Sequence, residues 1–154
     1  MKTREQQRDE ARERTYDIRH RLGQRGVVIV DLADGDPART VDALDMYVEL
    51  FWLPILGPSA YLAHRRLVQR ARLDGSGCLF VDLSVLGTEI GLGPGSGAAS
   101  SIVKTLTRLC EWNFAALTPT RFTVRNTVPR LTEKQVKRLP DSLREIHEMA
   151  VRRG

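Results

Sequence analysis

A helix predicted over residues 100–113 carries, along one side, residue types that suit contact with a polyanion. Its apolar residues fall on one side: Ile102, Val103, Leu106, Leu109 and Cys110. The opposite side carries hydroxyl and basic residues at helical spacing: Ser101, Lys104, Thr105 and Arg108, with Ser100 at the start of the helix. Short hydroxyls permit close approach, while lysine and arginine reach phosphate oxygens or guanine. The same pattern also fits a solvated helix face, and the residues alone leave both open.

A second basic pair follows in a predicted hairpin with strands at about Phe114–Leu117 and Phe122–Val128. Arg121 and Arg125 stand four residues apart, so an extended strand points both side chains to the same face. Arginines at such a place suit a minor groove or a phosphate ridge. They also serve as solubilising residues that prevent strand pairing at a sheet edge.

Other patterns that could support chemistry lack the context that they need. The loop Gly93–Ala98 matches G-x-G-x-x-A, but no strand directly precedes it and no acid follows about 20 residues on. The acids Asp31 and Asp34 fit a solvated turn. The histidines are scattered and the two cysteines form no metal-ligand spacing: His20, His64, His147, Cys78 and Cys110. We therefore expect no enzyme, no cofactor and no bound metal.

Length and composition favour one globular domain with a short appendage. The 154 residues are 42% hydrophobic and 28% charged, with a net charge of +5. Residues 1–26 hold eight basic against five acidic residues, 27–49 hold one against six, and 50–154 hold fifteen against eight. The basic globular part is typical of a polyanion binder. The charged amino terminus and the lack of a long apolar run predict a cytoplasmic protein with no secretory signal and no membrane contact.

Periodicity outlines the remaining elements. Residues 27–32 (VVIVDL) predict a strand. Thr40 is expected to cap a helix that runs to Phe51/Trp52, and Pro54 should kink or end it. A helix restarts at Gly57-Pro58-Ser59, and Thr132 should cap a final pair of short helices. The interval from 58 to 128 then reads helix, short strand, short helix, Gly-rich turn, amphipathic helix and two-stranded hairpin.

That order, and the residues themselves, resemble the winged helix-turn-helix family of bacterial DNA-binding proteins. LGPSAYLAHRRLVQRA resembles the first helix of the family, LSVLGTEIGLG the second, and SSIVKTLTRLCEWNFA the third helix running into the first wing strand. The resemblance covers about half the chain. One departure is the turn GLGPGSGAAS between the second and third helices, which is longer than usual and affects how the third helix would dock.

The resemblance implies a mostly α fold with a small β-hairpin (α+β), a winged helix-turn-helix with helical extensions at both ends. It also implies binding of double-stranded DNA, with the third helix in the major groove and the wing on the flanking backbone. Transcription regulation, or plasmid or phage maintenance, by a homodimer would follow. The alternative is a winged-helix protein–protein interaction module without direct DNA binding, which the acidic segment 27–49 favours.

The predicted organisation is a charged arm or helix over residues 1–25 and a single winged-helix domain over 26–154, with its core at 41–130 and helices at 131–154. The amino-terminal segment has few apolar residues, so it needs a partner to become ordered. It could lie along DNA as a basic arm, or pack on a second copy through Tyr16, Ile18 and Leu22. The acidic residues that alternate with the basic ones in this segment would repel phosphates, so they favour packing on a second copy.

Overall fold

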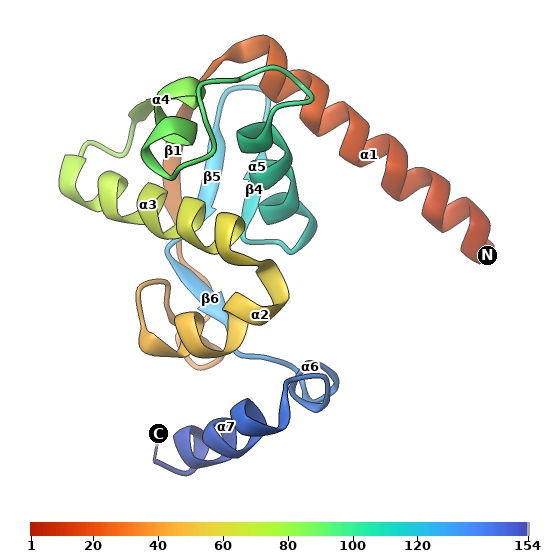
Figure 1. Cartoon of the computed structure of the whole chain (residues 1–154), viewed down its shortest axis with the longest axis vertical. Helices are drawn as coiled ribbons and strands as arrows, with labels where there is room; N and C mark the ends of the chain where they lie inside the picture. The colour runs from red at the N-terminus through yellow and green to blue at the C-terminus, as the bar shows by residue number, and fades with distance from the viewer. Residues whose placement is uncertain (154) are drawn as a thin grey trace.

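The computed structural model describes residues 1–153 as an α+β fold (Figure 1). Its elements over those residues are α1 (Arg4–Arg25), β1 (Val27–Ala33), β2 (Thr40–Asp42), the π-helical turn η1 (Val48–Trp52), α2 (Leu53–Leu56), α3 (Pro58–Asp74), β3 (Leu79–Asp82), α4 (Leu83–Glu89), α5 (Ser101–Glu111), β4 (Ala115–Leu117), β5 (Phe122–Arg125), β6 (Thr127–Pro129), α6 (Glu133–Lys137) and α7 (Asp141–Arg153). None of the helices in this part of the chain combines the length and the apolar character that a membrane span requires.

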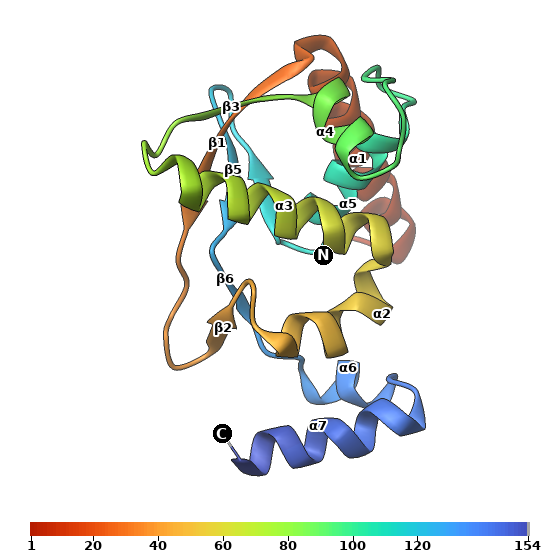
Figure 2. The ribbon, with the colours of Figure 1, turned by 60° about the vertical axis from the view of Figure 1, so that its left-hand side comes forward.

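The main sheet has four strands in the order β3-β1-β5-β4, so it is larger than the small hairpin expected from the sequence. β1 runs antiparallel to β3 and parallel to β5, with Val30 opposite Phe122. Strand alternation points Val28, Val30, Phe122 and Val124 to one face, where all four are buried. The helices α3 and α5 cover this face and leave the other open (Figure 2).

The prediction of a helix that begins at Thr40 is wrong. Thr40–Asp42 forms β2, which pairs antiparallel with Thr127–Pro129 in a second, two-stranded sheet. Helical structure starts only at Met46 and passes through η1, where the Leu53 N–H donates to the Val48 carbonyl. The wider π turn directly precedes Pro54, which has no N–H to continue a regular ladder.

Several other predictions are confirmed. The strand expected over residues 27–32 is β1, and the short helix expected before the Gly-rich turn is α4. Thr132 begins α6 with a capping box, since its side chain accepts from the Gln135 N–H and the Gln135 side chain accepts from the Thr132 N–H. The second hairpin strand is shorter than expected because the chain leaves the main sheet at Asn126 and continues as β6.

The amino-terminal segment is the 22-residue helix α1, which begins at a Thr3 capping box. Its last turns pack on the body: Leu22 is fully buried in the core and Ile18 packs against it. Tyr16 is 70% exposed, so it does not share their environment. The first half of the helix stands clear of the rest of the molecule (Figure 1).

Candidate nucleic-acid interface

Helix α5 begins at Ser100, whose side chain accepts a hydrogen bond from the Val103 N–H and donates one to the Gly97 carbonyl. The first of these bonds gives a partner to one of the unpaired N–H groups at the start of the helix, and together they stabilise its first turn. Ile102, Leu106 and Leu109 are buried against α3, α4 and the sheet. The sequence therefore predicted correctly where this helix begins and which side it buries.

The exposed side of α5 is narrower than the predicted stripe. Ser101, Lys104 and Arg108 are exposed, and Glu111 extends this side to the C-terminal end. Thr105, which the sequence placed on the same face, is only 8% exposed. It lies on the side of the stripe that turns toward the core, so most of its surface is covered.

Arg108 is held by the body of the protein. Its Nε donates to the Leu56 carbonyl at 2.6 Å and its Nη2 to the Ile55 carbonyl at 2.9 Å, at the C-terminal end of α2. These carbonyls lack intrahelical partners, and a cation suits the negative end of a helix. The side chain of Lys104, in contrast, makes no hydrogen bond or ion pair within residues 1–153, and its backbone N–H donates to the Ser100 carbonyl. It is the basic side chain that α5 leaves available.

The two hairpin arginines do not lie on the exposed side of α5. Since Phe122 and Val124 point to the helix-covered face of the sheet, Arg121 and Arg125 project from the opposite face. Arg121 donates to the Gly77 carbonyl and lies 3.8 Å from an Asp31 carboxylate oxygen.

Arg125 donates from Nε to the Asn113 carbonyl at 2.5 Å, where Asn113 adopts the left-handed conformation that ends α5. The structure thus brings Ser100, Ser101, Lys104 and Arg108 together along α5 and separates the hairpin arginines from them.

The loop between α4 and α5 keeps the long turn noted in the sequence. Gly91 and Gly93 have positive φ values of 83° and 84°, which glycine adopts without strain. A Cβ at Gly87 would come within 2.8 Å of the Gly93 carbonyl, so the loop packs tightly on α4. The loop then continues through Ala98 into α5, and α1 contacts the loop at Ala98.

Helix α1 runs beside α5, and this contact was missed from the sequence. The Arg19 Nε donates to the Ala98 carbonyl, ahead of α5, while the Thr15 hydroxyl donates to Glu111 at its far end. The two helices are therefore antiparallel. A Cβ at Gly23 would lie 2.4 Å from the Ala98 amide nitrogen, so glycine is required for this approach. The small residues Gly23 and Ala98 are the sequence signal, since they allow two backbones to meet.

Two of the histidines and one cysteine pack within the fold. Burial lowers the pKa of His64 to about 4, and its Nε2 lies 2.9 Å from the Arg125 carbonyl. His147 lies 2.8 Å from the Tyr47 hydroxyl, and burial lowers its pKa as well. Burial raises the pKa of the Cys110 thiol to about 12, which leaves it protonated and unreactive at neutral pH. Residues 1–153 contain no cluster of three potential metal ligands.

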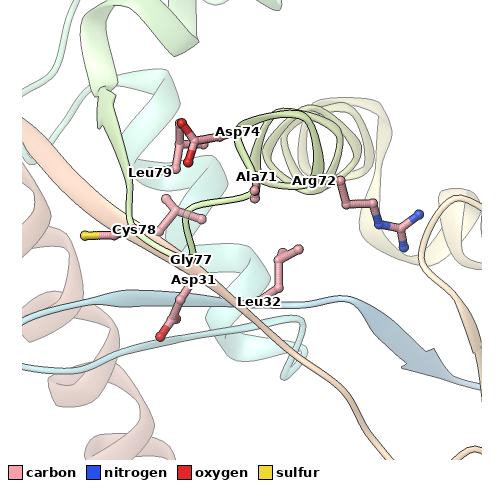
Figure 3. A pocket seen from close by; sticks show the side chains of 10 residues that line it. Asp31, Leu32, Ala71, Arg72, Asp74, Gly77, Cys78 and Leu79 are labelled. Atoms are coloured by element: carbon pink, nitrogen blue, oxygen red, sulfur yellow. The ribbon is translucent and has the colours of Figure 1, made fainter.

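A cleft of about 400 Å³ lies between β1, the end of α3 and the turn that precedes β3 (Figure 3). Its polar side chains diverge, because Arg72 turns away to Asp42 and Asn126 while Asp74 bonds to Ser76. One Asp31 carboxylate oxygen is buried there without a hydrogen-bond partner in the described part of the chain. No two of these groups converge on a common point.

Comparison with protein-family models, with curated proteins and with solved structures returns no match.

Proposed function

We propose that this protein binds double-stranded DNA through α5, in the manner of a winged helix-turn-helix. The proposal rests on the element order α3-β3-α4-α5-β4-β5 together with the open side of α5 that carries Ser101 and Lys104. This order is that of the winged helix, with β1 as an added strand between β3 and β5. In that family the exposed side of the third helix enters the major groove.

The mechanism is recognition without a chemical step. Ser101 lies in the first turn of α5, where a short hydroxyl and the adjacent backbone allow close approach to a phosphate or a base edge. Lys104 lies one turn further along and reaches a phosphate or a guanine. Arg108 contributes its charge while its guanidinium holds the end of α2. The hairpin arginines do not belong to this surface.

A transcription regulator, or an accessory of plasmid or phage maintenance, is the biological role that we propose. A homodimer would present two copies of α5 to half-sites about one helical turn apart. The dimer contact could be made by the amino-terminal segment or by the carboxy-terminal helices, and α1 buries Leu22 within its own chain. Helix α7, with Met149 and Val151 exposed, is therefore the segment that we favour.

The test is a titration of duplex DNA over a series of salt concentrations with the parent protein and with Lys104→Ala. The parent should bind, and its log affinity should fall linearly with log salt. Lys104→Ala should bind a selected site about tenfold more weakly, since one good contact contributes roughly 1–3 kcal/mol. Lys134→Ala, an exposed lysine on α6, is the matched control and should bind like the parent. Absence of binding at low salt would reject the proposal.

A second candidate is supported by the open face of the main sheet. Phe80 is 68% and Val27 44% exposed there, and Phe80 pairs with Ile29 across β3 and β1. Exposed apolar groups that lie together on a sheet mark protein contacts. A protein-interaction module would lose its partner on Phe80→Ser substitution and would be insensitive to Lys104→Ala, which separates this function from DNA binding.

A further inference from the structure

The arginines in the first half of α1 form a row. Arg4, Arg8 and Arg12 follow one another at intervals of four residues, so they lie about 6 Å apart along the helix axis and on one side of it. All three are exposed, and none has a hydrogen bond or an ion pair within residues 1–153. Three positive charges therefore line one edge of this part of the helix, while Glu5 and Asp9, three residues before Arg8 and Arg12, lie on the adjacent edge.

The body contacts of α1 establish which way this row faces. Arg25 donates to the Thr118 and Pro119 carbonyls, so its side of the helix faces the β4–β5 turn. Arg19 donates to the Ala98 carbonyl and points toward the start of α5, about 120° around the helix from Arg25. Arg8 and Arg12 lie within about 20° of the Arg19 direction, and Arg4 within about 60°. The row thus shares the side of α1 that meets the approach to α5.

The acids of α1 lie on the edge next to the row. Glu10 pairs with Lys2 and Asp17 with Arg21. Glu5, Asp9 and Glu13 also follow at intervals of four, and they lie about 40°, 80° and 120° around the helix from the Arg19 direction. The acids and bases that alternate in the sequence therefore form adjacent acidic and basic edges on the helix.

The reach of the row extends beyond α5. Because α1 is antiparallel to α5 and Thr15 meets Glu111 at the end of that helix, the eleven residues Arg4–Arg14 project about 16 Å past it. Duplex DNA carries one phosphate charge per about 1.7 Å of its axis, so a helix of this length passes several phosphates. For the row to contact the same duplex as Ser101 and Lys104, that duplex must extend past the Glu111 end of α5 along this edge of α1.

We infer that Arg4, Arg8 and Arg12 bind the phosphate backbone of duplex DNA next to the segment that α5 reads. This inference rests on the proposed function of α5. The row contacts phosphates and carries no base recognition, so it strengthens binding to every sequence and lengthens the footprint on one side. The two parts of the interface then differ in kind, since α5 selects a site and α1 adds affinity without selection.

The experiment compares the parent with two triple variants that lose the same charge. Arg4→Gln/Arg8→Gln/Arg12→Gln removes the row, and Lys134→Gln/Lys137→Gln/Arg138→Gln removes three exposed bases on and directly after α6, at the other end of the molecule (Figure 1). Each is titrated with a random-sequence duplex and a selected duplex over a salt series, and circular dichroism verifies that each remains helical.

We expect the row variant to bind both duplexes about tenfold or more weakly at 0.1 M salt, with a log–log salt slope reduced by about 2.7 for three lost phosphate contacts. The α6 variant should keep the parent slope to within about half a unit. Equal losses in both triples, or no loss in the row variant, would overturn the inference while leaving α5 as a DNA reader. A parent that binds no duplex would overturn both, and that titration alone identifies this case.

Discussion

Two groups of arginines in this chain have opposite surroundings. Those of the body donate to backbone carbonyls in distant segments: Arg25 to Thr118 and Pro119, Arg72 to Asn126, Arg108 to Ile55 and Leu56, Arg121 to Gly77, Arg125 to Asn113 and Arg130 to Ala38. Those that begin α1, Arg4, Arg8 and Arg12, stand in solvent without such partners. The same residue type therefore joins the fold in one region and remains available in the other.

The difference teaches how to interpret a basic composition. A guanidinium has five donors in a rigid fork and satisfies carbonyls at helix ends and turns, where no backbone amide can reach them. Such an arginine adds to the net charge, but its donors are committed to the protein. The candidate interface is therefore argued from unbonded basic side chains on and beside α5, which are Lys104 and the α1 row, and not from the total of +5.

The largest expected effect is on stability, and it distinguishes the part of α1 that packs on the body from the part that is exposed to solvent. Leu22→Ala should lower the free energy of unfolding by about 3 kcal/mol, because Leu22 is fully buried and its truncation leaves a cavity. For a chain of this size that corresponds to a melting temperature lower by about 6–12 °C. Tyr16→Ala, which removes a 70% exposed side chain, should change the free energy of unfolding by less than about 0.5 kcal/mol. Equal effects of the two substitutions would mean that α1 is not anchored as described.

The next largest effect is the pH dependence of stability that arises from the buried side chain of His64. His64 is buried beside the Arg125 carbonyl, and burial lowers its pKa from 6.5 to about 4. The unfolded chain therefore takes up this proton first, so stability is lost as pH falls below 6.5. Urea unfolding should give a free energy about 2 kcal/mol lower at pH 5 than at pH 7. His64→Gln should lose most of this dependence, while His20→Gln, on the exposed side of α1, should keep it. A parent-like pH dependence in His64→Gln would contradict the assignment.

A smaller effect compares one arginine from each group. Arg108→Ala should lower the free energy of unfolding by about 1.5 kcal/mol, because it leaves the Ile55 and Leu56 carbonyls without their charged donor. Arg8→Ala removes the same side chain from the open part of α1 and should change stability by less than about 0.5 kcal/mol. Thermal unfolding of the two variants, side by side, measures the difference. If Arg8→Ala proved as costly, the arginine row would have a structural partner.

Local patterns predicted much of the fold. The run of β-branched residues that forms β1, the Ser100 start of α5 and the Thr132 cap each depend on residues within a few positions of one another. Thr40 was misread for the opposite reason. Its apolar neighbours fit a helical period, yet β2 forms because residues 127–129 provide a partner strand nearly ninety positions away.

The candidate site was predictable in part. Apolar periodicity correctly gave the buried side of α5, and Lys104 lies exposed as its spacing indicates. Thr105 is buried because the covered arc of α5 is wider than the apolar residues alone describe, with α1 on one flank and α3 on the other. The bonds of Arg108, Arg121 and Arg125 join segments far apart in the sequence, so no local pattern could reveal that these donors are in use.

The position of β1 also has a consequence for synthesis and folding. This strand precedes its two neighbours along the chain, and it lies between β3 and β5, so it needs residues 79–82 on one side and residues 122–125 on the other. The centre of the sheet cannot close until the ribosome has released most of the chain. High contact order of this kind slows folding and leaves an apolar strand exposed in the meantime. Charged residues next to an exposed apolar strand oppose its aggregation, and the charged helix α1 ends two residues before β1.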